Sequence, residues 1–418
     1  MSSTNSSFYV LNDDSVKSCG RNDYGQLGLG DTNTRTTPTL IPDLDNVKQF
    51  SCGQFHIIFL LKDGTVKACG RNNYGQLGSG DKIDTTTSIS IPDLNNVKQV
   101  SCGYYHTVFL LNDGTVKTCG RNSDGQLGLG NTNTRTTPTL IPDLDNVKQI
   151  VCGTNHTLFL LNDGTVKACG RNDYGQLGLG NTTNRTTPTL ISDLDNVKQI
   201  SSGYSHTLFL LNDGTVKACG YNNYGQLGLG DTTNRTTPTL IPDLGNIKQI
   251  CVGNHHTVIL LNDGTVKVCG YNTNGQLGLG DTNDRTTPTS IPDLNNVKQV
   301  SCGGYHTLFL LNDGTVKVCG QNSQGQLGLG DTINRTTPTS IPDLDNVQKL
   351  SDVYNIEYYY YYLYNDMYGN FIYDNDDKII MSDVDSIITN APRSITQMLE
   401  MVNKENNVKI KKMIKGEI

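Results

Sequence analysis

Tryptophan is missing from this sequence of 418 residues, and basic side chains are outnumbered, with 33 Lys and Arg against 40 Asp and Glu. The formal net charge of -7 disfavours a partner held by a basic field alone, so we expect neither nucleic acid nor membrane binding. No run approaches the roughly 20 apolar residues of a membrane-spanning helix. The first twelve residues lack the basic and apolar parts of a secretory signal. We therefore expect a soluble protein of the cytoplasm, with the nucleus as the alternative.

Paired C-x-x-C spacing, which a zinc site would favour, does not occur among the twelve cysteines. The cysteines instead recur at intervals of fifty residues, unlike the irregular clusters of small disulfide-rich domains. Seven of them share one position: Cys19, Cys69, Cys119, Cys169, Cys219, Cys269 and Cys319. We predict buried free thiols that pack as small hydrophobic groups, and no metal site.

One unit of fifty residues is repeated without a gap from residue 1 to about residue 351. In the copy that covers 151–200, the apolar run HTLFLL at 156–161 predicts a strand covered on both faces. The Asn-Asp-Gly sequence that follows supplies a hairpin turn, because Gly reaches positive φ without steric cost. The residues 165–169 then form the second strand of the hairpin.

Two further extended segments complete the same unit, at 188–191 and 197–201. The first contains Pro188, which suits an edge strand. Four short strands without a helical period are typical of a propeller blade, and propellers commonly have about 4–8 blades. Seven units start near residues 13, 63, 113, 163, 213, 263 and 313. The fold class that we predict is all-β, a seven-bladed β-propeller of four-stranded blades with a short mixed C-terminal tail.

Three regions follow from this prediction: an N-terminal segment 1–12, the propeller 13–362 and a tail 363–418. Two segments compete to close the ring, 8–11 in the first region and the tyrosine-rich 356–364 at the other end. We favour a strand at 8–11 that pairs near the second segment. In the tail, a capping box at 394–397 precedes an amphipathic pattern that predicts a short helix. This helix either packs on the propeller or docks on a partner.

The recurring pattern G-x-x-H-T-x-x-L, followed by D-G-x-V-x-x-C-G-R-N-x-x-G-Q-L-G, resembles the regulator of chromosome condensation repeat. The resemblance spans 51–350 and the first partial unit. It implies a seven-bladed propeller from a family that includes exchange factors for small GTPases, chromatin binders, ubiquitin-ligase modules and scaffolds. The family usually carries Trp where every copy here has Cys before Gly. Because Cys is smaller, we expect the blades to close inward or Phe and Leu of HTLFLL to fill the space.

Residues that are identical in every copy are best assigned to architecture. Six histidines share one position and would be spread around a channel, so we expect local hydrogen bonding instead of a metal centre: His56, His106, His156, His206, His256 and His306. The G-Q-L-G-x-G loops are not followed by a helix, so we expect turns instead of phosphate cradles. No catalytic residue and no cofactor are predicted.

The residues that differ between copies are candidates for a binding surface. Two variable residues stand between Gly and His in each copy, and several are aromatic, as at protein-binding hot spots. The alternative is that they drift without selection. A second difference runs around the ring, because Arg in the first four copies becomes Tyr221, Tyr271 and Gln321 in the last three. The partner-binding residues that we predict are Phe55, Tyr104, Tyr105, Asn155, Tyr204, His255 and Tyr305.

The function predicted from these residues is that of a monomeric, non-enzymatic scaffold that binds a protein partner. The alternative is guanine-nucleotide exchange on a small Ras-like GTPase, which the family resemblance implies. Two observations speak against exchange: no Gly-x-x-His loop contains an acidic residue, and no unit exceeds fifty residues to hold an inserted wedge. Chromatin binding is disfavoured by the acidic charge balance. The tail is too short for the catalytic domain of a ubiquitin ligase.

Overall fold

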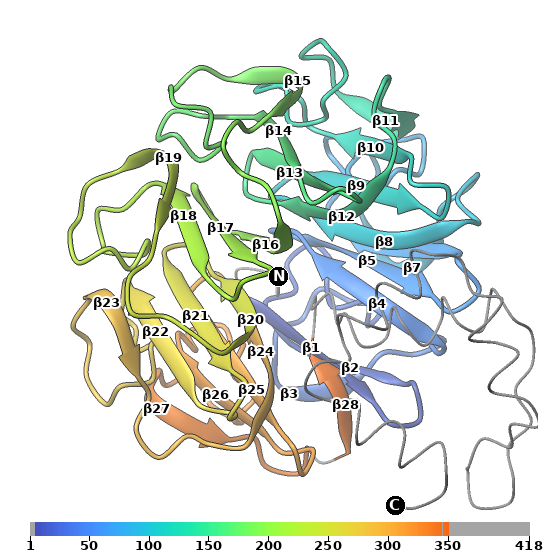
Figure 1. Cartoon of the computed structure of the whole chain (residues 1–418). Coiled ribbons are helices and arrows are strands. Elements are labelled where there is room, and N and C mark those ends of the chain that lie inside the picture. The colour runs from blue at the N-terminus through green and yellow to red at the C-terminus, as the bar shows by residue number, and fades with distance from the viewer. Residues whose placement is uncertain (1–4, 345, 351–418) are drawn as a thin grey trace, which may run out of the picture. The chain divides into compact units, whose positions relative to one another are not determined.

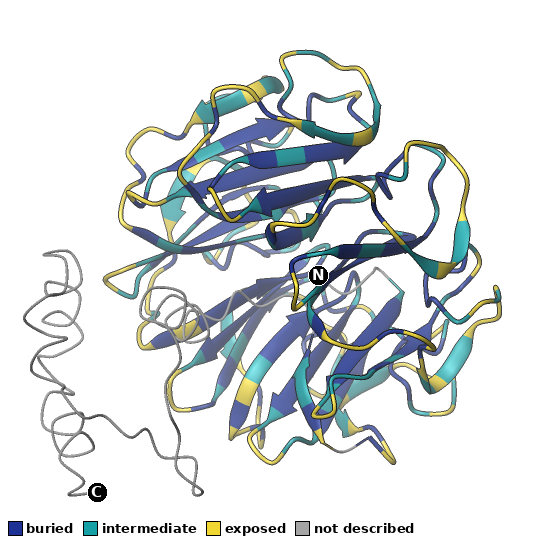
Figure 2. Cartoon of the chain, turned by 90° about the vertical axis from the view of Figure 1, so that its right-hand side faces the viewer, coloured by how far each residue is buried: buried dark blue, intermediate teal, exposed yellow. Residues whose placement is uncertain are grey.

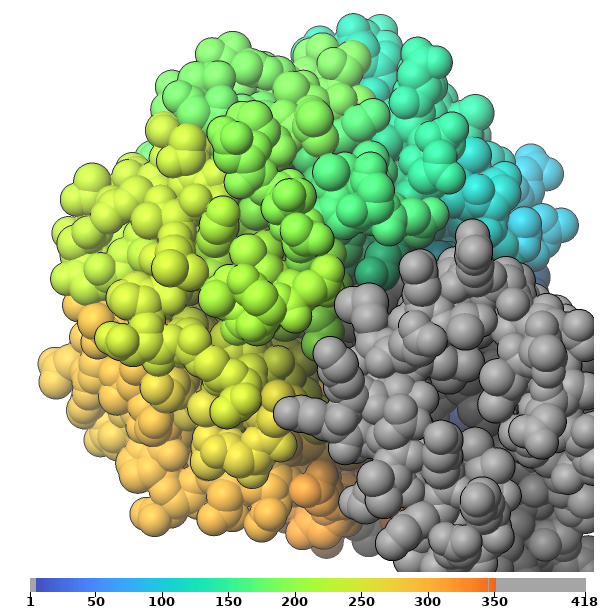
Figure 3. Space-filling view, viewed as in Figure 1, coloured from blue at the N-terminus to red at the C-terminus, as the bar shows by residue number. Residues whose placement is uncertain are grey.

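Seven antiparallel four-stranded sheets surround a central axis in the computed structural model, which describes residues 5–344 and 346–350 (Figure 1). No helix occurs within these described residues, so the predicted all-β propeller is confirmed. Among them, likewise, no helix is long and apolar enough to cross a membrane. Successive repeats follow one another around the face in colour order (Figure 3).

The four strands of each blade have fixed roles from the axis outward. The innermost strands are β28 (Val347–Leu350), β4 (Val47–Cys52), β8 (Val97–Cys102), β12 (Val147–Cys152), β16 (Val197–Ser202), β20 (Ile247–Val252) and β24 (Val297–Cys302). The second strands are β1 (Ser6–Leu11), β5 (His56–Leu61), β9 (His106–Leu111), β13 (His156–Leu161), β17 (His206–Leu211), β21 (His256–Leu261) and β25 (His306–Leu311).

The third strands are β2 (Val16–Gly20), β6 (Val66–Gly70), β10 (Val116–Gly120), β14 (Val166–Gly170), β18 (Val216–Gly220), β22 (Val266–Gly270) and β26 (Val316–Gly320). The outermost strands are β3 (Arg35–Leu40), β7 (Thr85–Ser90), β11 (Arg135–Leu140), β15 (Arg185–Leu190), β19 (Arg235–Leu240), β23 (Arg285–Ser290) and β27 (Arg335–Ser340). Blade 1 is the sheet β28-β1-β2-β3, and blades 2 to 7 follow in chain order, beginning with β4–β7.

The three inner strands of each blade are mostly buried, whereas the outermost strand is half-buried or exposed (Figure 2). The apolar HTLFLL strand, for example β13, is buried along all but its last residue and lies second from the axis. The strand that contains Pro188, β15, is the outer edge and starts at Arg185, earlier than the sequence indicated. Its residues are half-buried or exposed, which agrees with an edge position for proline.

The position that usually holds Trp in the family is filled by close approach of a neighbouring loop. The Cys169 thiol is fully buried and lies against Gly128 in the preceding blade, where an added Cβ would stand 3.2 Å from Sγ. Gly128 has φ +71°, a conformation that only glycine adopts without strain. The thiol also lies in the hydrophobic cluster that contains Phe159, so the glycine loop and the HTLFLL strand both pack around the smaller side chain. All twelve cysteines are free and buried, which confirms their predicted packing role.

The ring is closed inside blade 1 by strands from both ends of the repeat array. Strand β1 pairs with β2 on one side and with β28 on the other, with Tyr9 opposite Leu350. The segment 8–11 thus lies in the closing sheet, and its C-terminal partner is β28. The tyrosine-rich segment 356–364 and the predicted tail helix lie outside the described residues.

Candidate partner-binding face

The Gly-x-x-His loops connect the innermost and second strands, and backbone hydrogen bonds join each loop to the next. The first variable residue carries these bonds: Gln54 N to Tyr104 O (3.3 Å), Tyr104 N to Thr154 O (3.0 Å), Thr154 N to Gly203 O (3.3 Å), Tyr204 N to Asn254 O (3.2 Å) and Asn254 N to Gly304 O (3.0 Å). The variable side chains of blades 2 to 7 are therefore displayed from a hydrogen-bonded rim that runs along one mouth of the channel.

The repeated histidines lie beneath this rim, and each bonds to a hydroxyl group of the next blade. The Thr157 hydroxyl donates to Gln126 O at 2.8 Å, so it accepts the hydrogen of His106 Nε2 at 3.0 Å. His106 belongs to blade 3 and Thr157 to blade 4, so the bond joins two blades, whereas the sequence suggested local backbone partners. Burial lowers the pKa of His106 to about 3, and the neighbouring His156, His56 and Arg121 add to the shift. The imidazole is neutral and structural, as expected of a residue repeated in every blade.

Glycine is required directly below the rim because the histidine ring occupies the space of a side chain. A Cβ at Gly103 would lie 2.0 Å from His106 Cε1. Within the described residues, no group of His, Cys, Asp and Glu is arranged to hold a metal ion.

Two arcs of ring contacts lie on the rim, and we call their combined surface the aromatic face. The first arc holds Phe55, Tyr104 and Tyr105, which are joined by ring contacts of 6.5 Å between Phe55 and Tyr105 and 5.1 Å between the tyrosines. The guanidinium of Arg71 lies over Phe55 at 5.7 Å and over Tyr105 at 5.6 Å. Phe55 is only 8% exposed and supports the arc, whereas the tyrosines are half-buried and reach solvent.

The second arc lies on blades 5 to 7. Tyr204 and Tyr305 both contact His255, at 5.2 and 6.3 Å between ring centroids. The Arg-to-Tyr change places Tyr221 and Tyr271 in the same arc, at 5.7 and 6.5 Å from His255. Burial lowers the pKa of His255 to about 4, so its ring is neutral at physiological pH. The arc is therefore an uncharged aromatic surface.

Tyr104 belongs to the first arc and lines a pocket at the mouth of the channel together with Asn254 and Gly304 of other blades. Burial raises its pKa to about 12, and the nearby Tyr105, Tyr204 and Tyr305 hydroxyls add to the shift. The structure thus brings six of the seven predicted residues into ring contact. Asn155, the seventh, makes no such contact, and its buried Oδ1 has no hydrogen-bond partner among the described residues.

Sequence reasoning missed one set of members of the aromatic face. Tyr24 contacts Phe55 at 5.0 Å, Tyr74 contacts Tyr105 at 5.3 Å and Tyr224 contacts His255 at 5.4 Å. These tyrosines occupy the residue before the Gly of G-Q-L-G. That position is Tyr in four copies but Asp, Asn or Gln in the other three, so its variation was a usable signal.

The basic side of the ring is partly neutralised by neighbouring carboxylates. Arg21 pairs with Asp23 at 2.5 Å and Arg171 with Asp173 at 2.6 Å. Arg71 is followed by Asn73 and stacks instead over Tyr24 at 4.7 Å. The arginines of the first blades therefore act as much through ring stacking as through charge.

These features define a propeller whose repeated residues build the ring and whose variable residues gather at one mouth. The RCC1-like domain model matches residues 85–242 and 194–356, and two models of the regulator of chromosome condensation (RCC1) repeat match 13–60 and 47–76. The chain belongs to the RCC1 repeat family.

Solved structures with the same fold include two of yeast RCC1. Yeast RCC1 (Prp20) bound to Kap60 is 24% identical, covers 81% of this chain and 84% of its own, and has a TM-score of 0.72. Prp20p from Saccharomyces cerevisiae, in a structure reported with its binding to Gsp1p and histones, is 24% identical over 82% and 87%, with a TM-score of 0.71. Human WBSCR16 is 26% identical over 81% and 93%, with a TM-score of 0.69.

Proposed function

We propose that this protein is a non-enzymatic platform that holds a protein partner on the aromatic face. The observation that carries the proposal is that residues which differ between near-identical repeats meet in two arcs at one mouth of the ring. Tyr is enriched at the centre of protein interfaces because it buries a large area at a small entropic cost. The hydrogen-bonded rim supports these side chains in place, which reduces the ordering cost of binding.

The chemistry of the two arcs favours a partner segment with two kinds of contact. The first arc combines rings with Arg71, which suits carboxylate or aromatic side chains. The second arc is neutral and aromatic, which suits apolar or cationic side chains. The proteins of similar fold add support, since yeast RCC1 was solved with Kap60 and Prp20p is reported to bind Gsp1p and histones. The twelve buried thiols favour a reducing compartment such as the cytoplasm.

A second candidate function is nucleotide exchange on a small GTPase. The likeness to Prp20p, reported to bind Gsp1p, favours it. The absence of acidic residues from the Gly-x-x-His loops speaks against it. A nucleotide-release assay on a panel of small GTPases separates the two functions, because a platform leaves every release rate unchanged and an exchange factor accelerates at least one.

The test of the platform is affinity capture with quantitative mass spectrometry on the full chain. The variant Y104A/Y105A/Y204A removes aromatic side chains from both arcs. The matched control, L140A/L190A/L240A, removes the same number of large side chains, 52 to 53% exposed, from outer strands. We expect recovery of the specific partner to fall about tenfold or more in the first variant and to persist in the second. Equal recovery with both would contradict the proposal.

A further inference from the structure

The innermost strand of blade 6 breaks the repeat in the placement of its cysteine. In three other copies the last residue of this strand is cysteine and a serine precedes it, as in Ser101-Cys102. Strand β20 instead ends in Cys251-Val252, so its cysteine is displaced by one place. Because successive side chains of a strand point to opposite sides, this displacement turns the thiol to the other side of the strand. The next innermost strand, β24, ends regularly in Cys302.

The contacts of the regular copies show what each of the two positions faces. Cys102 Sγ lies 3.3 Å from Ser51 O in the preceding blade, and Cys102 N donates to Ser51 Oγ at 2.9 Å. Cys152 makes the same two contacts with Ser101, at 3.4 and 3.0 Å. The serine position therefore faces the following blade, and the cysteine position of that blade faces back toward it.

With cysteine at the serine position, two thiols meet between blades 6 and 7. The thiol and the backbone N–H of Cys302 both donate hydrogen bonds to Cys251 Sγ, and both side chains lie in one hydrophobic cluster. Beside them, Gln249 Nε2 donates to Val300 O at 2.7 Å, and Val300 N donates to Gln249 Oε1 at 3.2 Å, which holds the two strands together. The four equivalent pairs between blades 2 and 6 each contain at least one Ser or Val instead of Cys.

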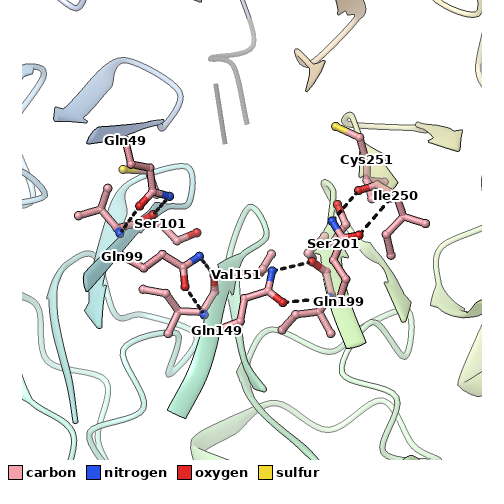
Figure 4. Close-up of a pocket in the computed structure, with 15 residues that line it drawn as sticks. Gln49, Gln99, Ser101, Gln149, Val151, Gln199, Ser201, Ile250 and Cys251 are labelled. Atoms are coloured by element: carbon pink, nitrogen blue, oxygen red, sulfur yellow. Dashed lines mark hydrogen bonds between the residues drawn. The ribbon is translucent and has the colours of Figure 1, made fainter. Parts of the chain in front are cut away.

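Cys251 is the member of the pair that reaches the channel. It is 9% exposed and lines the channel pocket together with Ser101 and Ser201 (Figure 4), whereas Cys302 is fully buried. The hydrogen bond from the Cys302 thiol lowers the pKa of Cys251 against the opposing effect of burial. Burial raises the pKa of Cys302 and of the seven thiols that share the position of Cys169. Because the thiolate is the reactive form of cysteine, the pair combines an accessible thiol that ionises more readily with a protonated thiol beside it.

We propose that Cys251 and Cys302 form an oxidation site, which closes to a disulfide between blades 6 and 7 when a hydroperoxide enters the channel. The Cys251 sulfur attacks one peroxide oxygen, so that an S–O bond forms, the O–O bond breaks and water leaves with the proton of the thiol. The Cys302 sulfur then attacks the Cys251 sulfenic acid, so that the S–S bond forms, the S–O bond breaks and a second water leaves. Two thiols are oxidised, and one hydrogen peroxide is reduced to two waters.

The oxidation site does not rest on the proposed function, because neither thiol belongs to the aromatic face, and peptide mapping of the full chain tests it. Trypsin releases Cys251 in the peptide 249–267 and Cys302 in the peptide 299–317, and neither peptide contains another cysteine. The chain is treated with a small molar excess of hydrogen peroxide, and the remaining thiols are alkylated. We expect mass spectrometry to find these two peptides joined, in a yield at least about tenfold above that of any other cysteine pair. A reductant should release them.

Two conservative variants separate the roles of the two thiols. Blade 5 carries serine at both positions, so we expect C251S and C302S to fold. C302S should leave the Cys251 sulfenic acid unresolved and raise its labelling by dimedone about tenfold over the parent, whereas C251S should leave Cys302 unlabelled. The matched control C152S removes a thiol that is equivalent to Cys302 but faces Ser101, and we expect it to give the joined peptides in the yield of the parent.

Three results would overturn the inference: no joined peptides from the parent chain, an equal yield of Cys302 joined to its neighbour Cys319, or no more dimedone labelling of C302S than of the parent. Thermal melting gives a second measurement on the intact fold. The oxidised parent should melt above the reduced parent, because a disulfide constrains the unfolded chain, and C251S should melt at the same temperature with and without peroxide. An equal rise in C251S would assign the effect to other thiols and count against the site.

Discussion

Six of the seven blade interfaces share one polar design, and the interface between blades 1 and 2 differs from all of them. At the blade 2–3 interface, His56 Nε2 bonds to Thr107 Oγ1 at 3.0 Å. Gln49 Nε2 donates to Val100 O and Val100 N donates to Gln49 Oε1, both at 3.2 Å, and we call such a pair of hydrogen bonds a glutamine bracket. The other five interfaces repeat the glutamine bonds and a bond from histidine to a hydroxyl, with Ser7 in the place of Thr where blade 7 meets blade 1. At the blade 4–5 interface, His156 Nε2 also bonds to Ser202 Oγ at 2.7 Å.

At the blade 1–2 interface, both the histidine–hydroxyl bond and the glutamine bonds are replaced. Ser6 stands at the histidine position and Ile57 at the threonine position, while Lys349 takes the glutamine position and donates to Val47 O at 3.3 Å. A buried imidazole N–H without its hydroxyl acceptor would be unsatisfied, so loss of the hydroxyl favours loss of the histidine. The histidine and the threonine of one hydrogen-bonded pair are therefore replaced together at this interface.

Other contacts replace the lost hydrogen bonds at this interface. Phe8 contacts Phe50 at 5.6 Å and Phe59 at 6.3 Å. Lys62 pairs with Asp14 at 2.6 Å, where the other complete copies carry Asn and Gly. The blade 1–2 interface is therefore more apolar in its interior, and its surface carries an ion pair whose two residues the other complete copies lack.

Acid should produce the largest effect, through the six polar interfaces. Burial lowers the pKa of His156 to about 3, and the equivalent histidines shift in the same direction. The unfolded chain binds these protons near pH 6.5, so stability is full above that pH and is lost as the pH falls toward 3. Each histidine contributes up to about 1.4 kcal/mol per pH unit.

Circular dichroism across a pH series checks this expectation. We predict cooperative unfolding between about pH 6 and 4. A free energy of unfolding that does not change over this interval would show that the histidines are not buried in the neutral form.

Removal of one histidine should be the next largest effect and should distinguish the two kinds of interface. The variant H106A loses the bond to Thr157 and leaves a cavity, so we expect a loss of about 2–4 kcal/mol. Its counterpart S6A at the blade 1–2 interface loses only the hydrogen bond to Arg21 O, so we expect about 1 kcal/mol. Urea unfolding measures both values, and equal losses would remove the distinction.

Exchanging lysine and glutamine at the bracket position should change the free energy of unfolding in opposite directions at the blade 1–2 and blade 4–5 interfaces. The variant K349Q restores a glutamine bracket and removes a buried amino group, so we expect a gain of about 1 kcal/mol. The reverse change, Q149K, breaks the bracket to Ile200 and buries a charge, so we expect a loss of about 2–3 kcal/mol. Thermal melting of the pair provides the comparison, and destabilisation by both changes would contradict it.

Loss of the ion pair between Lys62 and Asp14 should have the smallest effect on stability. Lys62 is 46% exposed and Asp14 is 23% exposed, so solvent screens their attraction. A double-mutant cycle with K62N and D14G should give a coupling energy below about 1 kcal/mol. A larger value would mean that this pair, and not the phenylalanine cluster, compensates for the missing hydrogen bonds.

The strands and the number of blades followed from the sequence because each blade repeats the same local signals. The run HTLFLL and its hairpin turn are local, and β13 matches the predicted bounds. The pairing of His106 with Thr157 was not predicted, since it joins residues 51 positions apart in different blades. A clue was present in the sequence, because Ser6 and Ile57 break the repeat with the same spacing.

The aromatic face was predicted in part for the same reason. Variation between copies identified Tyr204, His255 and Tyr305, and the fold brings the two tyrosine rings into contact with His255. Tyr24 and Tyr74 escaped notice because they are regular in most copies, and only the ring geometry shows that they reach Phe55 and Tyr105.

The central claim is that repeated residues build the ring and variable residues hold the partner. Radical footprinting of the full chain, alone and with its captured partner, tests this claim most directly. We predict protection of Tyr104, Tyr204 and Tyr305, with unchanged labelling of the exposed Leu140 and Leu190 on the outer strands. Protection of the outer-strand leucines with unchanged labelling of the three tyrosines would contradict the account.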